Sequence, residues 1–406
     1  MAKIKEIIAS EILNAKGLPT VEVAVILNDG KTGIASCPSG KIIADYEALE
    51  LKDHDQSRFH GQGVLKAVAN IRNMIAPRLV GKEVEHQQEI DRIMIDLDGT
   101  QNKSRLGANA ILAVSMAVAK AGAASSVLPL FIYLRQFIRK GKDLLKIPIP
   151  IFNFMNEKKG NEMIDFHEFL VVPASFKSYT ESIQIGEMII NSLKQTEEKL
   201  TSNLATNKET ISLISQAIDN SHLRLGLDVF LGLNCRASSF FRNGKYYLKE
   251  IPNDLSSQDL IDYYEGFNKN NNLLYLEDPL DQNDWDGWTN LSKKLSESAI
   301  IAGGDLIATN PYRLQIALDK KAVNAIVIKP SQAGTVIESL AIAEAAKESG
   351  LKIVVSHRGD ETNDDFLADF AVAIIADYIK LGSLDKGENI AKYNRLMQIE
   401  NQLKIL

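Results

Sequence analysis

Five short apolar runs between residues 273 and 383 constrain the fold most, because each of them ends on a polar or charged residue. Segments with helical periodicity separate the runs, as at 335–348 and 364–376. The runs follow one another at intervals of roughly 25 residues, the length of one strand–helix unit in a parallel (β/α) barrel. The carboxyl ends of parallel strands converge on one face of such a barrel. We therefore expect one pocket to contain the residues that end the runs: Glu277, Asp305, Lys329, His357 and Lys380.

The front of the chain has a different pattern. It predicts three antiparallel strands, at 4–13, 21–27 and 32–37, which are separated by turns rich in Gly, Pro and Asn. Helical periodicity follows, at 46–51, 64–80 and 108–124. Further strands are expected behind this region, at 147–154, 166–172 and 223–233. The predicted fold class is α/β, with an N-terminal α+β domain over residues 1–139 and a C-terminal eightfold barrel domain over residues 140–406.

Composition excludes several classes of function. The chain has 406 residues and a net charge of −6, and no basic surface for nucleic acid is expected from this acidic average. Cys37 and Cys235 are the only cysteines, too few for a disulfide framework. The sequence shows neither a signal peptide nor an apolar run of about 18 residues. We expect a cytoplasmic protein without a membrane span.

The residues that end the strands have both a chemical and a purely structural interpretation. Lys329 follows an apolar strand, where neighbouring charges can lower the pKa of a lysine enough for it to act as a base, or it simply pairs with a carboxylate. Glu277 and Asp278 are either a metal ligand with its support or a pair that caps the next segment. Arg358 suits a phosphate or carboxylate, or else a salt bridge to Asp360 or Glu361. Together with Lys380, these cations favour a small anionic ligand.

Longer motifs in the same order resemble the enolase (phosphopyruvate hydratase) family over nearly the whole chain. In the front half they are 17–22, 38–40, 47–51, 93–100 and 107–115. In the back half they are 284–287, 356–358, 361–362, 379–380 and 391–394. The resemblance implies an α+β domain followed by an eightfold barrel, magnesium as cofactor, and dehydration of 2-phosphoglycerate to phosphoenolpyruvate. It also implies a homodimer, and display at the cell surface is known in the family.

The resemblance assigns roles to individual residues. Lys329 matches the lysine that removes the proton, and Glu168 matches a glutamate near the departing hydroxyl. The expected substrate-binding residues are His167, which stands where the family has glutamine, together with His357, Arg358 and Lys380.

The magnesium site is expected to be degenerate. The three family ligands, Asp, Glu and Asp, match Asn234, Glu277 and Gly304, and Asp305 is expected to point away from the site. A single anionic ligand is fewer than Mg²⁺ normally needs. Further departures are Ile42 in place of a serine, Gly359 in place of a serine, and a loop at 156–160 that lacks the family histidine. The Gly-Asp-Glu-Gly-Gly segment that holds the catalytic acid has no counterpart between Lys194 and Leu213.

These losses predict that the dehydration is strongly impaired or absent. Two alternatives stay open. The chain is a non-catalytic paralogue that acts as a binding or assembly protein, or it is an enzyme that acts on another small phosphorylated or carboxylic acid.

Overall fold

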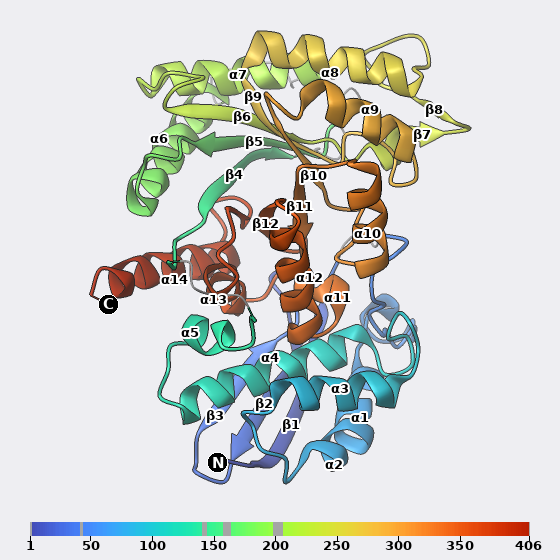
Figure 1. Cartoon of the computed structure of the whole chain (residues 1–406), viewed down its shortest axis with the longest axis vertical. Helices are drawn as coiled ribbons and strands as arrows, with labels where there is room; N and C mark the ends of the chain where they lie inside the picture. Colours follow the sequence, from blue (N-terminus) through green and yellow to red (C-terminus); the bar gives the residue numbers. More distant parts are fainter. Residues whose placement is uncertain (1, 41–43, 140–143, 157–163, 198–205, 406) are drawn as a thin grey trace.

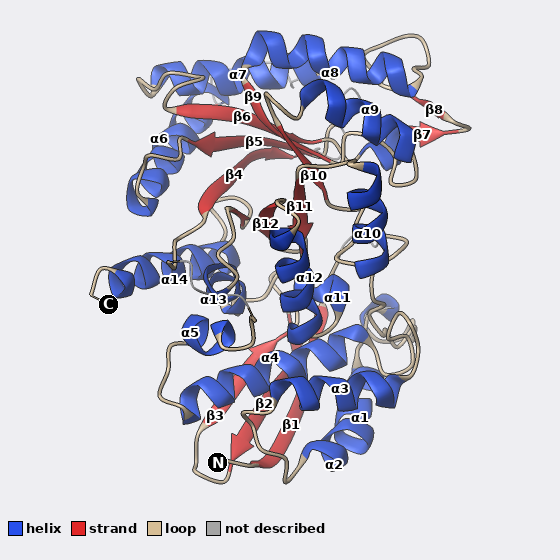
Figure 2. Ribbon diagram, viewed as in Figure 1, coloured by secondary structure: helices blue, strands red, loops and turns tan. Residues whose placement is uncertain are grey.

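The protein consists of a small α+β domain and a large barrel domain stacked end to end (Figures 1 and 2). The computed structural model describes residues 2–40, 44–139, 144–156, 164–197 and 206–405. The expected domain boundary between residues 139 and 140 lies at the edge of the undescribed residues 140–143.

The N-terminal domain is an antiparallel sheet covered by helices on one face (Figure 2). Its strands are adjacent in sequence order: β1 (Ile4–Leu13), β2 (Pro19–Leu27) and β3 (Thr32–Ser36). Alternate β2 residues such as Val21, Val23 and Val25 are buried, and they pack under the Ala-rich helix α4. The helices are α1 (Leu65–Asn70), α2 (Ala76–Leu79), α3 (Gln87–Asp98), α4 (Ala108–Ser125) and α5 (Leu130–Arg135). A 3₁₀ turn η1 (Phe59–Gly61) precedes α1, and a π segment η2 (Ile71–Ile75) joins α1 to α2.

The helix predicted at 46–51 is wrong. The backbone amides there bond to distant partners, since Ala48 N donates to Gln332 O and Leu49 N donates to Asn102 O. These tertiary bonds replace the local bonds that a helix would need, so the segment runs without regular structure between the two domains.

Eight strands close the barrel, in the order β10-β11-β12-β13-β4-β5-β6-β9. Five are the predicted runs: β9 (Leu273–Glu277), β10 (Ile300–Gly303), β11 (Ala325–Ile328), β12 (Lys352–Ser356) and β13 (Tyr378–Lys380). The others are β4 (Ile149–Asn156), β5 (Glu168–Pro173) and β6 (Val229–Asn234). The barrel is not all-parallel, because β5 pairs antiparallel with both β4 and β6. The first residue of β5 therefore lies at the same end of the barrel as the last residues of the other strands.

Apolar side chains fill the inside of the barrel in layers, as packed barrels require. They include Ile151, Leu170, Tyr275, Val327 and Val354. Around the strands lie α6 (Tyr179–Glu197), α7 (Asn207–Asn220), α8 (Ser257–Asn271), α9 (Trp285–Leu295), α10 (Pro311–Lys320), α11 (Pro330–Ala333), α12 (Val336–Glu348), α13 (Phe366–Ala373) and α14 (Gly387–Leu403). A 3₁₀ turn η3 (Ala237–Phe240) and a short hairpin of β7 (Phe241–Arg242) and β8 (Lys245–Tyr246) follow β6.

One described helix, α4, is long and apolar enough to cross a membrane by length and composition. It lies largely buried, against the sheet on one side and near α11 and α12 of the barrel domain on the other. A core position explains its apolar character.

Candidate active site at the barrel mouth

A cavity of about 500 Å³ opens where the carboxyl ends of the strands meet. All the residues expected to form the site line it: His167, Glu168, Asn234, Glu277, Asp305, Lys329, His357, Arg358 and Lys380. Strand-end spacing predicted one pocket for five of these residues, and the family resemblance supplied the other four. The roles of all nine stay predictions.

The reversed direction of β5 brings three polar residues into one row. Glu168 is paired with Asn234 across β5 and β6, and Asn234 is paired with Glu277 across β6 and β9. Asn234 Nδ2 donates to Glu168 Oε2 at 2.8 Å, and Asn153 Nδ2 donates to Glu168 Oε1 at 2.8 Å. Glu168 is therefore held by amide groups from the strands on both sides of it.

The Lys380 ammonium joins the two buried glutamates of this row. Its Nζ lies 2.6 Å from Glu168 Oε2 and 2.7 Å from Glu277 Oε2, and all three side chains are less than a tenth exposed. Burial raises the pKa of Glu168, but the charges of Lys380, His167 and His357 outweigh burial and hold this pKa well below its ordinary value. Burial lowers the pKa of Lys380, and the two carboxylates raise it further than burial lowers it. The ammonium and the Glu168 carboxylate are therefore both charged at neutral pH.

Two buried acceptor oxygens in this row have no hydrogen-bond partner within the described part of the chain. They are Asn234 Oδ1 and Glu277 Oε1. The other Glu277 oxygen accepts from Tyr275 Oη at 2.6 Å in addition to Lys380. A buried acceptor without a partner costs stability, so these two oxygens are suited to a donor group that comes from outside the protein.

Asp278 fills the space beside Gly304, the residue that the resemblance matches to the family's third carboxylate. Asp278 Oδ1 accepts from Gly304 N at 2.9 Å, and Asp278 Oδ2 accepts from Asp305 N at 2.8 Å. A Cβ on Gly304 would lie 2.5 Å from Asp278 Oδ2. Burial, Asp305 and Glu277 raise the pKa of Asp278 to about 7. Asp278 thus binds the loop after β10, rather than capping the segment that follows it in sequence.

Asp305 lines the cavity instead of pointing away from it. The expectation assumed that strand alternation continues past Gly304. Strand β10 ends at Gly303 and the chain turns there, so the two-residue period no longer sets the direction of the next side chain.

Arg358 is bound by the N-terminal domain. Its Nη1 and Nη2 donate to the two oxygens of Glu47 at 3.0 and 2.7 Å, and both side chains are buried. Burial lowers the pKa of Arg358, but Glu47 outweighs burial and raises it. The alternative of a salt bridge to Glu361 is not seen, because Arg358 donates to Glu361 only through its backbone amide, at 2.8 Å, and the Glu361 carboxylate pairs with Lys392 Nζ at 3.0 Å.

Lys329 and His357 have open polar atoms. The Lys329 side chain makes no hydrogen bond or ion pair with any described residue, so the structural alternative of a simple carboxylate pair is not seen there. Burial lowers the pKa of His357 to about 4, and its Nδ1 has no partner in the described chain. At neutral pH this imidazole is therefore neutral, with a polar atom available to a ligand.

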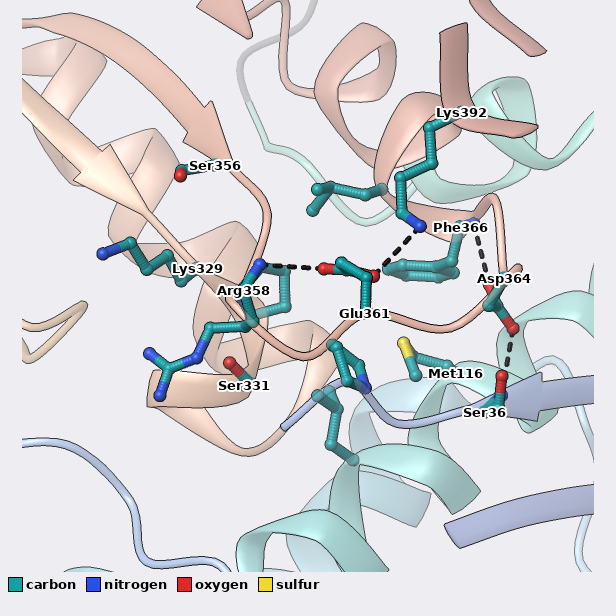
Figure 3. Close-up of a pocket in the computed structure, with 14 residues that line it drawn as sticks. Ser36, Met116, Lys329, Ser331, Ser356, Arg358, Glu361, Asp364, Phe366 and Lys392 are labelled. Atoms are coloured by element: carbon teal, nitrogen blue, oxygen red, sulfur yellow. Dashed lines mark hydrogen bonds and ion pairs between the residues drawn. The ribbon is translucent and has the colours of Figure 1, made fainter. Parts of the chain in front are cut away.

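A second cavity, of about 30 Å³, lies between the domains (Figure 3). Leu112, Met116 and Phe366 are among the apolar residues in its wall. In Figure 3 the Lys329 and Arg358 side chains extend to the side away from Met116 and Phe366. Both residues also line the larger cavity at the barrel mouth. The small cavity has room for about one or two waters.

Sequence reasoning missed two residues that shape the site. Arg236 lines the cavity two positions after Asn234, and the strand-end rule could have found it if it had been applied to the residues just beyond β6. Glu47 contacts Arg358 across 311 positions of sequence, and no local pattern signals such a contact.

Three sequence expectations fall outside the described residues. Ile42 belongs to 41–43, most of the loop at 156–160 belongs to 157–163, and the shortened acidic region includes 198–205. Gly359, expected from the same comparison with the family, does line the cavity.

The residues present do not fit the family's magnesium site. Within the described ranges, no group of three or more His, Cys, Asp or Glu side chains is placed to hold a metal ion. Of the three family positions, Glu277 has one oxygen already bound by Lys380 and Tyr275, Asn234 offers an amide oxygen, and Gly304 has no side chain. Mg²⁺ demands an octahedral shell, in which one or two carboxylates usually bind it, and it gives up its waters reluctantly. A fixed ammonium 2.7 Å from the only remaining carboxylate disfavours a divalent cation further.

Comparison with known families agrees with the architecture. A model described as enolase, N-terminal domain, matches residues 4–134. A model described as enolase, C-terminal TIM barrel domain, matches residues 144–405. The matched regions correspond to the antiparallel sheet with its helices and to the closed eight-stranded barrel. The chain therefore belongs to the enolase family.

Proposed function

We propose that this enolase-family protein binds a small phosphorylated or carboxylic acid at the barrel mouth, and that its dehydration of 2-phosphoglycerate is strongly impaired or absent. One observation supports this proposal above the others. Lys380 Nζ bridges Glu168 and Glu277 at 2.6 and 2.7 Å, so a side-chain cation lies between the two carboxylates that remain in the row and offsets one of their two negative charges.

The family reaction needs much more positive charge than this lysine supplies. Removing a proton beside a carboxylate creates a doubly charged carboxylate, and in the family two magnesium ions stabilise it. Lys329 is available as the base. Negative charge would develop next to Lys329, and the metal ions that stabilise it in the family have few ligands here, since Gly304 has no side chain and Asn234 is uncharged.

For loss of the hydroxyl, the resemblance matches no described residue to the family's proton donor. Hydroxide leaves poorly unless an acid protonates it. Glu168 is the nearest matching residue, but Lys380 and the two histidines hold its pKa low, so it carries no proton to give at neutral pH. It is suited to position a ligand hydroxyl, as an acceptor, and not to protonate it.

Binding of an acid is supported by cations that the protein itself does not neutralise. Lys329 and Arg236 line the cavity without an ion pair to any described residue, and His357 offers a neutral imidazole nitrogen. Such groups bind a carboxylate or phosphate directly. A paralogue that acts only as an assembly protein would not need them to face an open cavity. A homodimer and a cytoplasmic location stay predictions.

A coupled assay tests the catalytic half of the proposal. The full chain is given 2-phosphoglycerate with excess magnesium, and an active enolase is measured in parallel. An electrostatic group of this kind is typically worth about 10²- to 10³-fold in rate, so we expect turnover to be at least about a thousandfold slower than that of the active enzyme. Turnover at ordinary enolase rates would overturn the proposal.

A screen of small acids by thermal unfolding tests the binding half. The acid-binding proposal predicts that at least one phosphorylated or carboxylic acid raises the melting temperature. If none does, while turnover is also absent, the assembly-protein alternative is favoured instead.

A further inference from the structure

Arg236 is a cation of this cavity to which neither the family resemblance nor the strand-end pattern assigns a role. It directly follows β6 and Cys235 and precedes η3. The amides on either side fix it to the end of β9 and to the residue after it, because Cys235 N donates to Glu277 O and Ala237 N donates to Asp278 O, both at 2.9 Å. Arg236 is therefore held at the rim directly beyond Asn234 and Glu277.

The Arg236 backbone is left-handed, with φ 48° and ψ 52°. This conformation is unfavourable for a side chain with a Cβ. These two backbone bonds hold it there, and the side chain is partly exposed in the cavity wall. Its guanidinium makes no hydrogen bond or ion pair with the residues that the structure describes.

The charges around Arg236 leave it open to an anion. Lys380 pairs with both Glu168 and Glu277 and offsets one of their two negative charges. Asp278 is occupied by the amides of the loop after β10. Arg358 is bound by Glu47 and offers little to a ligand. Arg236 and Lys329 line the same cavity without an ion pair to a described residue, as do Lys16 and Lys386 elsewhere in the chain, and Asp305 is one of the carboxylates in its wall.

The same cavity offers acceptors as well as cations. Asn234 Oδ1 and Glu277 Oε1 are buried and unpartnered within the described residues, and they lie in adjacent, paired positions of β6 and β9. A ligand hydroxyl can donate to either oxygen. An anionic group on the same ligand would then lie toward Arg236, which follows Asn234 by two residues.

We propose that Arg236, together with Lys329, binds the anionic group of a small hydroxy acid directly and without a metal ion, while Asn234 and Glu277 accept a hydrogen bond from its hydroxyl. This inference rests on the proposed function and specifies its ligand class. The anionic group is a carboxylate or a phosphate, and both have the oxygen geometry that a guanidinium binds with two parallel hydrogen bonds. Arg236 is thus a specificity-determining residue of this chain.

Isothermal titration calorimetry of the full chain in EDTA tests the proposal. The probes are glycerate, 2-phosphoglycerate and inorganic phosphate, with propionate as an acid that has no hydroxyl. We expect the wild-type protein to bind glycerate or 2-phosphoglycerate without metal. Propionate should bind more weakly than glycerate, because it leaves the two acceptors unpartnered. Stronger binding of glycerate identifies a carboxylate site, and stronger binding of 2-phosphoglycerate identifies a phosphate site.

Substitution of Arg236 supplies the decisive comparison. Losing a charge-assisted hydrogen-bond pair should weaken binding by about 10- to 100-fold in Arg236→Ala. Arg236→Asn is the second variant, because asparagine adopts the left-handed backbone more readily and keeps the fold at this position. Arg236→Lys should bind with intermediate affinity, since it keeps the charge and loses the fork. Arg242→Ala is the matched control: it removes the same charge from the exposed hairpin strand β7, outside the cavity, and should bind as the wild type does.

The proposal is wrong if the wild type binds these acids only when magnesium is present, if it binds none of them, or if Arg236→Ala and Arg236→Asn bind them unchanged. Failure of the proposed function is seen in the other two assays, as fast turnover of 2-phosphoglycerate or as a thermal screen in which no acid raises the melting temperature. If acids bind and the Arg236 variants bind them unchanged, only the present proposal fails.

Discussion

Replacing Lys380 by methionine should both destabilise the barrel and create a need for a divalent cation. The substitution keeps a long apolar side chain but removes the ammonium that lies 2.6 Å from Glu168 and 2.7 Å from Glu277. The side chains of the three residues are 3%, 8% and 0% exposed, so water cannot take over from the lost charge. Removing one partner of a buried ion pair typically costs about 3–5 kcal/mol, because the other charge stays buried and unpaired. We expect Lys380→Met to lose that much stability in EDTA.

Magnesium should then restore part of the loss. With the ammonium gone, both glutamates and the unpartnered Asn234 Oδ1 can face a cation. A ligand present at about 100 times its dissociation constant stabilises the folded state by about 2.7 kcal/mol. The variant should therefore gain stability with added magnesium, whereas the wild type should gain little.

Urea unfolding followed by tryptophan fluorescence measures both effects. Trp285 and Trp288 are the only tryptophans and both lie in α9, so the signal reports on the barrel. The control is Lys269→Met, which removes an ion pair of 2.8 Å to Glu265 on the surface of α8 and should leave the midpoint unchanged. The reasoning is refuted if Lys380→Met unfolds at the wild-type midpoint in EDTA, or if magnesium stabilises the wild type as much as the variant.

Three further predictions follow from other contacts. Glu47→Gln should destabilise the domain interface by about 3 kcal/mol and tighten phosphate binding, because it releases the buried Arg358 guanidinium. Unfolding measures the first effect and calorimetry the second, and weaker phosphate binding would contradict the prediction. Gly304→Asp should not restore magnesium binding and should lower the free energy of unfolding by about 1–3 kcal/mol, because its Cβ would meet Asp278 Oδ2 at 2.5 Å. Magnesium titration and thermal melting check this. A variant that is as stable as the wild type and binds the ion refutes it. Burial raises the pKa of Asp91 to about 7, against the opposing hydrogen bonds from Ser115, Ile337 and Gln87 and with Glu338 nearby as a further negative charge. The folded state therefore binds more protons than the unfolded state between pH 4 and 7, and stability should fall as pH rises through that window. Asp91→Asn should flatten this fall, and an unchanged pH profile of the unfolding free energy would count against the prediction.

The barrel could be predicted from sequence because its signals are local and repeated. Each strand from β9 to β13 is an apolar run that ends on a polar residue, and the chain keeps this period through five units. The N-terminal sheet was predictable for the same reason, since its turns contain the residues that turns require. The extended segment at 46–51 was not predictable, because bonds to Gln332 and Asn102 override its helical pattern.

The site was predictable in its membership and not in its connections. Strand ends and family motifs identified the residues that line the cavity. The pairing of Arg358 with Glu47, and of Lys380 with both glutamates, depends on contacts between segments 103 to 311 residues apart. Asp305 shows the limit of periodicity: its direction is set by the turn after β10, so the alternation of the strand gave the wrong side.

We expect that the wild-type site binds no divalent cation beside Glu277, because Lys380 is already paired with Glu168 and Glu277. Diffraction from crystals soaked in manganese, measured at an energy where manganese scatters anomalously, tests it directly, since Mn²⁺ accepts the same oxygen ligands as Mg²⁺. We expect no anomalous peak beside Glu277 and Asn234 in the wild type, and a peak there in Lys380→Met. Two well-ordered manganese ions at the mouth of the wild-type barrel would contradict it.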